Sequence, residues 1–219
     1  MPHTKRISLL SLLVGLAGLI GGQLAAIGTS PAGAEVLTLD IDPLASRIEF
    51  GFGATFQSVV GSLQLQGGSI RFDTASGAAS GEAAAAAGTA RTGVKRRDRK
   101  MHEKILESAL YPTIVFSVER IDGTLNRAGR SELQLHGTLK LHGVSRPAAM
   151  PAVAVVNGDQ VKATGYLTID YLSYGMRDPS FLLLRVEKKV KVKLTIAGHL
   201  APAASAALAR PANSPPPHP

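Results

Sequence analysis

Residues 97–116 read RDRKMHEKILESALYPTIVF, which joins a charged amphipathic segment directly to an apolar, β-branched run. Within 97–110 the apolar residues recur near the 3.6-residue period of a helix, and charged residues fill most of the other positions. Asp98 can cap the start of this helix, whereas Pro112 cannot continue it and favours extended backbone just before it. We therefore expect a helix over 97–110, followed at once by a strand over 111–116.

Apolar residues alternate with polar or small residues along much of the remaining chain, which is typical of strands with one buried face. The apolar residues Leu63 and Leu65 fall on odd-numbered positions, whereas Ile70 and Phe72 fall on even-numbered positions. A bulge at Gly67-Gly68 would place both sets on the same face of the strand. On the last strand the lysines of 189–193 fall on the outer face. The expected inward faces comprise Ile48, Phe50, Phe52, Leu63, Leu65, Ile70, Phe72, Ile114, Phe116, Val118, Leu133, Leu135, Leu139, Leu141, Val153, Val155, Leu167, Ile169, Val186, Val190, Val192, Leu194 and Ile196.

The alanine run at 83–87 has high intrinsic helix propensity, but its flanking glycines bracket too few residues for a stable helix, and we expect a strand. Short loops at Asp122-Gly123 and at 157–159 join neighbouring strands, as in a meander. A sheet this long usually closes on itself, which removes its edges. The sequence therefore predicts an all-β fold, a closed antiparallel β-barrel of about eight strands with one short helix between strands.

The first residues have the pattern of an export signal. Lys5 and Arg6 precede an apolar run over 7–20, and an Ala-Gly-Ala sequence at 32–34 precedes Glu35. We expect cleavage before Glu35 and a location in the periplasm or outside the cell. An uncleaved anchor is the alternative, because looser apolar character continues beyond the run and a spanning helix needs about 20 such residues.

The mature chain is expected to hold one domain, over residues 35–200. Residues 201–219 are rich in Ala and Pro and lack apolar periodicity, so we expect a disordered tail. The chain contains no cysteine, which excludes a disulfide framework and a lipid-attachment cysteine. The stability of the domain must therefore come from its core.

Several motifs, in this order along the chain, resemble the YceI-like family of lipocalin-like barrels that bind polyisoprenoid lipids. The resemblance covers most of the chain, and it implies a lumen occupied by a polyisoprenoid such as a quinone or prenyl chain. The motifs that carry it are 47–52, Thr92-Gly93, Arg97-Asp98, Leu106-Glu107, 111–116, 139–147 and Asp178-Pro179-Ser180.

The barrel interior is expected to be apolar and uncharged. An eight-stranded barrel can be filled by side chains or can hold one small ligand. Periodicity alone favours a filled core plugged by helix residues, whereas the absence of Trp, the scarcity of aromatic residues and the family resemblance favour an open lumen. The expected ligand-binding residues are Ile48, Phe50, Phe52, Leu63, Leu65, Phe72, Met101, Ile105, Ile114, Phe116, Leu135, Leu139, Leu167, Val192 and Leu194.

The chain is basic, with a formal net charge of +8, and an exported basic protein favours membrane headgroups or anionic ligands over nucleic acid. One basic cluster stands out at the start of the predicted helix. It is either a solvated face or a contact for an anionic membrane or a prenyl phosphate at the barrel mouth. The loop over 170–179 is expected to form another part of the rim. The cluster comprises Lys95, Arg96, Arg97, Arg99 and Lys100.

No catalytic constellation is evident, and we expect neither an enzyme nor a metal or cofactor site beyond a bound lipid. His136 and His142 should both point outward and lie too far apart to share a metal ion. His102 is expected to be a solvated helix residue. The alternatives are a lumen enzyme with His102 or Tyr174 as acid or base, and a membrane-surface module that uses the lysines of 189–193. A homodimer is a further possible assembly.

Overall fold

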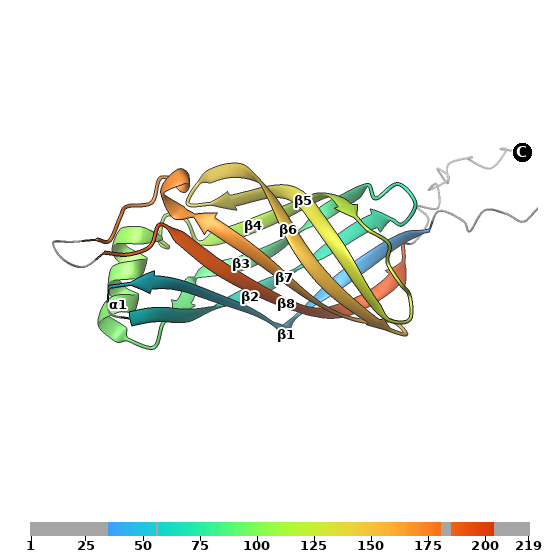
Figure 1. The fold of residues 1–219 in the computed structure, drawn as a ribbon, viewed down its shortest axis with the longest axis horizontal. Helices are drawn as coiled ribbons and strands as arrows, with labels where there is room; N and C mark the ends of the chain where they lie inside the picture. The colour runs from blue at the N-terminus through green and yellow to red at the C-terminus, as the bar shows by residue number, and fades with distance from the viewer. Residues whose placement is uncertain (1–34, 56, 181–184, 204–219) are drawn as a thin grey trace, which may run out of the picture. The chain divides into compact units, whose positions relative to one another are not determined.

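The chain folds into one closed antiparallel barrel in which each strand pairs with its neighbours in sequence and the last pairs with the first (Figure 1). The computed structural model describes residues 35–55, 57–180 and 185–203. The predicted all-β barrel is therefore confirmed. Among these residues the strands are β1 (Val36–Ala54), β2 (Gln57–Asp73), β3 (Ala79–Arg91), β4 (Thr113–Asp122), β5 (Arg130–Leu141), β6 (Val144–Asn157), β7 (Gln160–Asp170) and β8 (Lys189–Pro202).

The predicted strand in the alanine run is correct. Alanines 83–86 pair with β2 on one side and with β4 on the other, so the ladder overrides their helix propensity. The predicted bulge is present but lies one residue earlier, at Gln66, because the β2–β3 register shifts between Leu65 and Gly67 whereas Gly67 and Gly68 pair regularly with Ala84 and Ala83. A Cβ at Gly68 would collide with the carbonyl oxygen of Glu82, so glycine is required at this close approach.

The helix between β3 and β4 differs from the prediction at both ends. Helix α1 (Lys95–Lys100) continues as a π-helical turn, η1 (Met101–Ile105), and the helical segment ends five residues before Leu110. Val94, not Asp98, is the N-cap residue, and no side chain caps the helix. Glu107 has a left-handed φ of 43°, and its carbonyl accepts from Leu110 N and Tyr111 N. This local turn ends the helix before Pro112 can do so.

In strand β6 the residues that point into the barrel are the neighbours of those predicted to do so. Val155 is 47% exposed, whereas Ala154 and Val156 are buried. The reason is the β5–β6 register, which places Met150 directly opposite the inward-facing Leu135, and residues opposite each other in a ladder share a face. The expected inward placement of Val153 and Val155 is therefore wrong.

One connection and one boundary also differ from the predictions. The β4–β5 connection spans 123–129 instead of the short loop expected at Asp122-Gly123. The short loop expected at 157–159 is present as a two-residue turn, Gly158-Asp159, between β6 and β7. Strand β8 continues to Pro202, which pairs with Leu37, so the barrel extends two residues into the predicted tail. The predicted signal segment and residues 204–219 lie outside the described residues.

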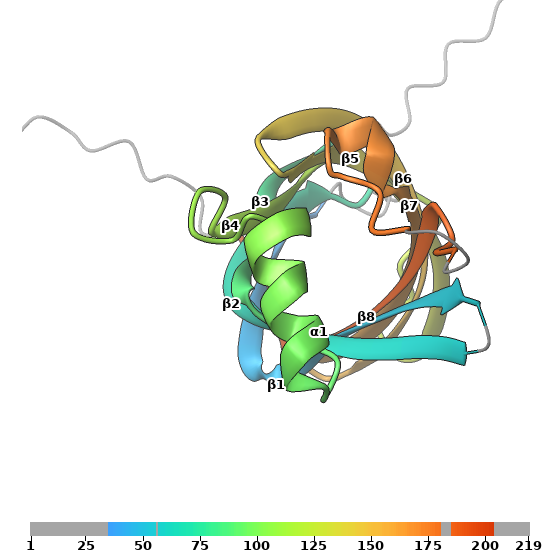
Figure 2. The same cartoon turned by 90° about the vertical axis from the view of Figure 1, so that its left-hand side faces the viewer.

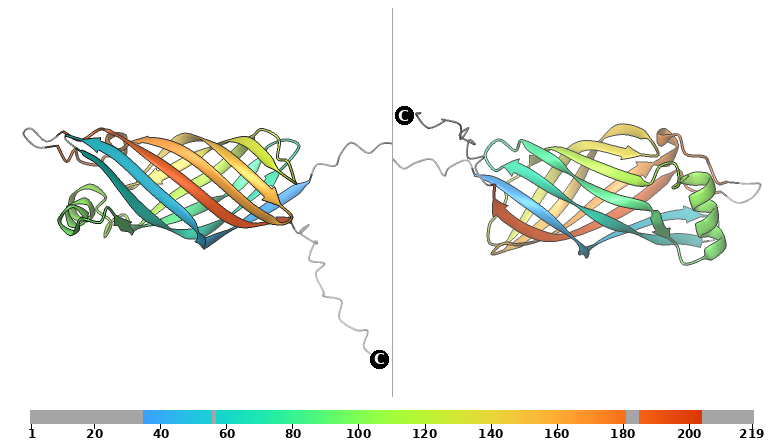
Figure 3. Two further views of the ribbon diagram at one scale, coloured as in Figure 1. Left: turned by 60° about the horizontal axis from the view of Figure 1, so that its bottom comes forward. Right: turned by 180° about the vertical axis from the view of Figure 1, so that it is seen from behind.

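Helix α1 lies at one end of the barrel, and β1 begins at the opposite end (Figures 2 and 3). The 3-10 helix η2 (Tyr171–Tyr174), between β7 and β8, lies at the same end as α1. We call this end the mouth and the opposite end the base. Among the described residues, no helix is long and apolar enough to cross a membrane.

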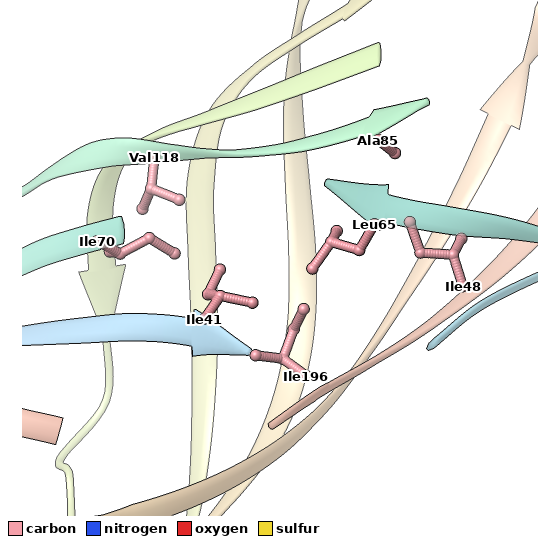
Figure 4. Packing of buried hydrophobic residues seen from close by; sticks show 7 residues of the cluster. All are labelled: Ile41, Ile48, Leu65, Ile70, Ala85, Val118 and Ile196. Atoms are coloured by element: carbon pink, nitrogen blue, oxygen red, sulfur yellow. The ribbon is translucent and has the colours of Figure 1, made fainter. Parts of the chain in front are cut away.

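The barrel core consists of three clusters along its length. A central cluster joins inward side chains of five strands (Figure 4). A base cluster surrounds Leu37 at the start of β1, and a mouth cluster surrounds Tyr171 and Tyr174 of η2. Full burial of one aliphatic or aromatic side chain contributes roughly 1.5–3 kcal/mol, so the central cluster alone stabilises the closed barrel substantially. Its members are Ile41, Ile48, Leu65, Ile70, Ala85, Val118 and Ile196.

The barrel wall is discontinuous on the mouth side between β6 and β7. Their pairing runs from Asn157↔Gln160 to Ala152↔Gly165, and within the described part of the chain no register pair joins 144–151 to β7. Side-chain contacts close this seam instead, since Arg146 Nε donates a hydrogen bond to Ser173 O of η2 over 2.7 Å. The segment after β7 therefore substitutes for strand pairing at the mouth.

Candidate ligand cavity

The mouth half of the barrel encloses a cavity of about 340 Å³. Inward side chains of the strands form its wall, and Met101 and Ile105 reach it from η1. The apolar lining consists of Ile48, Phe50, Phe52, Ala54, Val59, Leu63, Leu65, Ala83, Ala85, Ala90, Met101, Ile105, Leu106, Ile114, Phe116, Leu139, Leu141, Met150, Leu167, Ile169, Met176, Pro179, Val186, Val190, Val192 and Leu194.

Of the fifteen residues expected to contact a ligand, all but Phe72 and Leu135 line this cavity. Those two line a separate space of about 90 Å³ in the base half. The strands are long enough to pass both spaces, and side chains such as Phe116 and Leu194 contribute to each. Alternation along a strand identifies the inner face but not the depth at which packing closes the lumen.

The lining also contains residues that the prediction omitted. Val59 lies on the same face of β2 as the predicted Leu63 and Leu65, so alternation extended by four residues would have found it. Ala85 lies in the alanine run, where both faces of the strand have the same composition. Tyr171, Met176 and Pro179 lie in the connection between β7 and β8, in the loop expected at the rim. No periodic signal marks the residues of such a loop.

Three polar residues from the start of the helical segment line the cavity, namely Thr92, Arg97 and Lys100. Arg97 Nε donates to Thr92 Oγ1 over 2.7 Å, and its Nη2 donates to Thr92 O over 3.1 Å. The Thr92 hydroxyl and backbone N–H in turn donate to Asp98. Burial raises the pKa of Asp98, but the Thr92 hydrogen bonds and the charges of Arg97 and His102 outweigh it and lower the pKa below its usual value.

The structure divides the basic cluster that the sequence predicts as one unit. Arg97 and Lys100 line the cavity, whereas Lys95, Arg96 and Arg99 are exposed and are not among the lining residues. Among the described residues, none of these five side chains forms an ion pair with a carboxylate. The mouth therefore carries positive charge at the cavity edge and on the outer surface of the helix.

His102 is not the solvated residue that the sequence predicts. Its Nδ1 lies 3.0 Å from Ser108 Oγ, and its Nε2 lies 2.8 Å from Ala90 O of β3. These contacts fix the helical segment to the barrel. Neither His102 nor Tyr174, the two acid–base candidates of the enzyme alternative, is among the residues that line the cavity.

His142 is also placed differently from the prediction. Its side chain is only 9% exposed, and the ring lies between Glu107 Oε2, at 2.9 Å, and Tyr174 O, at 3.2 Å. The cause is local, since His142 opens the β5–β6 turn with a left-handed φ of 50° and so leaves the alternation of β5. His136 does point outward, with Nε2 3.0 Å from Asp122. No metal-binding cluster of three or more groups occurs among the described residues.

Tyr171 contributes the one buried side-chain hydroxyl of the described residues that has no hydrogen-bond partner. Tyr171 is 5% exposed and lines the cavity. Burial raises the pKa of its hydroxyl to about 12, with further contributions from the nearby charges of Asp178 and Asp170. The Asp178 carboxylate also interacts directly with this hydroxyl, which raises the pKa of Tyr171 further, but the two groups lie outside the distance and angle of a hydrogen bond.

Comparison with solved structures supports the same architecture. BcnA of Burkholderia cenocepacia aligns with a TM-score of 0.60 and 17% identity, covering 72% of this chain and 99% of BcnA. A polyisoprenoid-binding domain of Saccharophagus degradans, implicated in plant cell wall breakdown, aligns with a TM-score of 0.58 and 17% identity over 76% of this chain and 99% of that domain. The YceI protein of Campylobacter jejuni gives 0.52 and 14% over 66% and 86%.

A search of curated proteins gave no match. The family assignment comes from the sequence itself, because the model of the YceI-like domain matches residues 39–198, which include nearly the whole barrel and all the described cavity residues. The chain therefore belongs to the YceI-like domain family.

Proposed function

We propose that this protein binds a polyisoprenoid lipid, with the hydrocarbon chain of the lipid in the mouth-half cavity. The observation that carries the proposal is the cavity lining, which is apolar except for a few residues at the mouth end and in the rim loop. The cavity volume of about 340 Å³ falls within the roughly 300–1,000 Å³ of small-molecule sites. The similar Saccharophagus domain is itself described as polyisoprenoid-binding.

The mechanism is sequestration of the lipid from water. Each CH₂ group removed from water contributes about 0.8 kcal/mol, so a few isoprene units are enough to offset the cost of ordering the chain. The cations Arg97 and Lys100 and the rim residue Tyr171 would then meet the polar head of the lipid. No step in this mechanism changes a covalent bond.

The test is native mass spectrometry of the full chain purified without detergent, followed by organic extraction of any bound lipid. A copurifying isoprenoid, or stoichiometric uptake of an added one, is the expected result. A folded barrel that carries no lipid and takes up neither quinones nor prenyl phosphates would refute the proposal. Such a result would favour the alternative of a membrane-surface module.

We also propose that the chain is exported and cleaved before Glu35, on the basis of its N-terminal sequence. Expression in a bacterial host and cell fractionation would place the protein in the periplasm or the medium. The intact mass would correspond to a chain that starts at Glu35. A full-length chain retained in the cytoplasm would contradict this proposal.

The exposed cations of α1 support a third proposal, that the mouth contacts anionic membranes. Lys95, Arg96 and Arg99 lie on the helix that crosses the barrel end (Figure 2), and within the described residues they form no ion pairs. A cation close to an anionic bilayer contributes about 1 kcal/mol. Contact through this helix would place the cavity opening next to the membrane, from which the lipid would enter.

A further inference from the structure

The unpartnered hydroxyl of Tyr171 is the feature of the cavity that its apolar lining does not explain. The residue is 5% exposed, and its oxygen has no hydrogen-bond partner among the described residues. Buried hydroxyl groups are normally paired, because an unpaired one loses its hydration without compensation. A polar group retained at such a position in a hydrocarbon-binding cavity points to a partner supplied by the ligand.

The ring of Tyr171 is held in a fixed position. It begins η2, where Asp170 Oδ1 accepts from Leu172 N at 3.2 Å and Ser173 Oγ donates to Asp170 O at 2.7 Å. Its side chain packs in the mouth cluster with Leu139 and Met176, which also line the cavity. A ligand atom can therefore meet this hydroxyl without paying the cost of ordering it.

The charges around Tyr171 define the kind of atom that it can meet. Asp178 and Asp170 act on the hydroxyl electrostatically and, together with burial, keep it protonated, so it remains a hydrogen-bond donor. The loop holds Asp178 in this position, since its Oδ1 accepts a hydrogen bond from Ser180 N at 2.8 Å. Two nearby carboxylates repel an anionic oxygen of a ligand but exert no such repulsion on a neutral oxygen.

We propose that Tyr171 donates a hydrogen bond to a neutral oxygen in the head of the bound isoprenoid, such as a quinone carbonyl. This inference rests on the proposed lipid-binding function and makes it more specific. The ligand is then an isoprenoid with a carbonyl-type acceptor close to the start of its chain, not a plain hydrocarbon. A phosphate head would instead be met by Arg97 and Lys100, with no contribution from Tyr171.

Three probes with the same tail test this inference: farnesene, a benzoquinone that carries a farnesyl chain, and farnesyl diphosphate. Their affinities are measured for the wild type, for Tyr171→Phe and for Tyr174→Phe. Tyr174 is the matched control, because it is equally buried in the same helix but does not line the cavity. We expect Tyr171→Phe to weaken quinone binding roughly 3- to 10-fold and to leave the other two affinities unchanged.

An equal loss for all three probes would indicate a change of cavity shape and would overturn the inference, as would no loss for the quinone. A selective loss for the diphosphate would overturn the neutral-head assignment. Thermal unfolding of the ligand-free proteins adds a second readout. Tyr171→Phe should unfold no earlier than the wild type, and a clear decrease would show that the hydroxyl already has a protein partner. Failure of the wild type to bind any probe would instead refute the lipid-binding function itself.

Discussion

The imidazole Nε2 of His142 lies 2.9 Å from Glu107 Oε2, and both residues have left-handed backbone angles, with φ of 50° and 43°. The contact joins the segment after the helix to the β5–β6 turn, which are far apart in sequence. Tyr111 packs against the same imidazole, with ring centroids 4.3 Å apart. These contacts hold the helical segment in place over the cavity mouth.

Removal of the Glu107 carboxylate should therefore destabilise the protein. We expect Glu107→Ala to lower the free energy of unfolding by about 2 kcal/mol, since a hydrogen bond with a charged partner is lost at a largely buried ring. Urea denaturation measures the effect. Glu103→Ala, at an exposed position of η1, is the control and should change the free energy of unfolding little. Equal losses in the two variants would contradict this role for the His142–Glu107 contact.

A larger side chain at Ala85 should block the cavity without unfolding the barrel. Ala85 is 4% exposed and lines the cavity, so Ala85→Leu places three additional carbons in the space of the ligand. The displaced hydrocarbon costs about 2 kcal/mol, which corresponds to a roughly 30-fold weaker affinity for an isoprenoid. Ala84→Leu, at the adjacent position that does not line the cavity, is the control. Fluorescence displacement measures both, and equal affinities would place the ligand elsewhere.

The lowered pKa of Asp98 predicts a contribution to stability that depends on pH. Because the folded pKa lies below the unfolded value of about 3.9, this contribution is present above that value and is lost as the pH falls through the folded pKa. Asp98→Asn should thus be less stable than the wild type at pH 7, and the difference should narrow below about pH 4. Denaturation curves at pH 7, 4 and 2 test this. A stability difference between the two proteins that stays constant over this pH range would show that protonation of Asp98 is not coupled to folding.

The two basic surfaces can be separated by variants of equal charge. We expect the triple change of Lys95, Arg96 and Arg99 to Gln to weaken binding to phosphatidylglycerol vesicles roughly 100-fold at low salt. The triple change of the 189–193 lysines to Gln removes the same charge from the outer wall of β8 and should have a small effect. Vesicle sedimentation measures both. A larger loss of vesicle affinity for the β8 variant than for the α1 variant would favour the surface-module alternative.

The barrel and most of its lining follow from sequence because a closed barrel has one apolar face per strand. Alternation in β1, β4 and β8 thus located inner residues such as Phe50, Ile114 and Val192. The same reasoning failed in β6, where Val and Ala occur on both faces and only the cross-strand register decides between them. Periodicity identifies the inward face of a strand only where the two faces differ in composition.

The remaining errors have a conformational or tertiary origin. The helix ends early because Glu107 adopts left-handed angles, which its residue type does not predict. His142 is buried because it leaves β5 and meets Glu107, a residue 35 positions away. Tyr171 lies in an aperiodic connection, and only the three-dimensional structure shows that its hydroxyl is buried at the cavity.

The unpaired stretch of β6 at the seam has a consequence for assembly. His142 and Gly143 both have positive φ, so Leu141 and Val144 close the turn as a hydrogen-bonded pair, and alternate residues beyond Val144 face away from β5. Pro147 and Pro151 occupy two of these positions and lack the N–H group that a docking strand would need. The protein can therefore leave this stretch of β6 without a paired strand and still not offer a template for intermolecular β-aggregation.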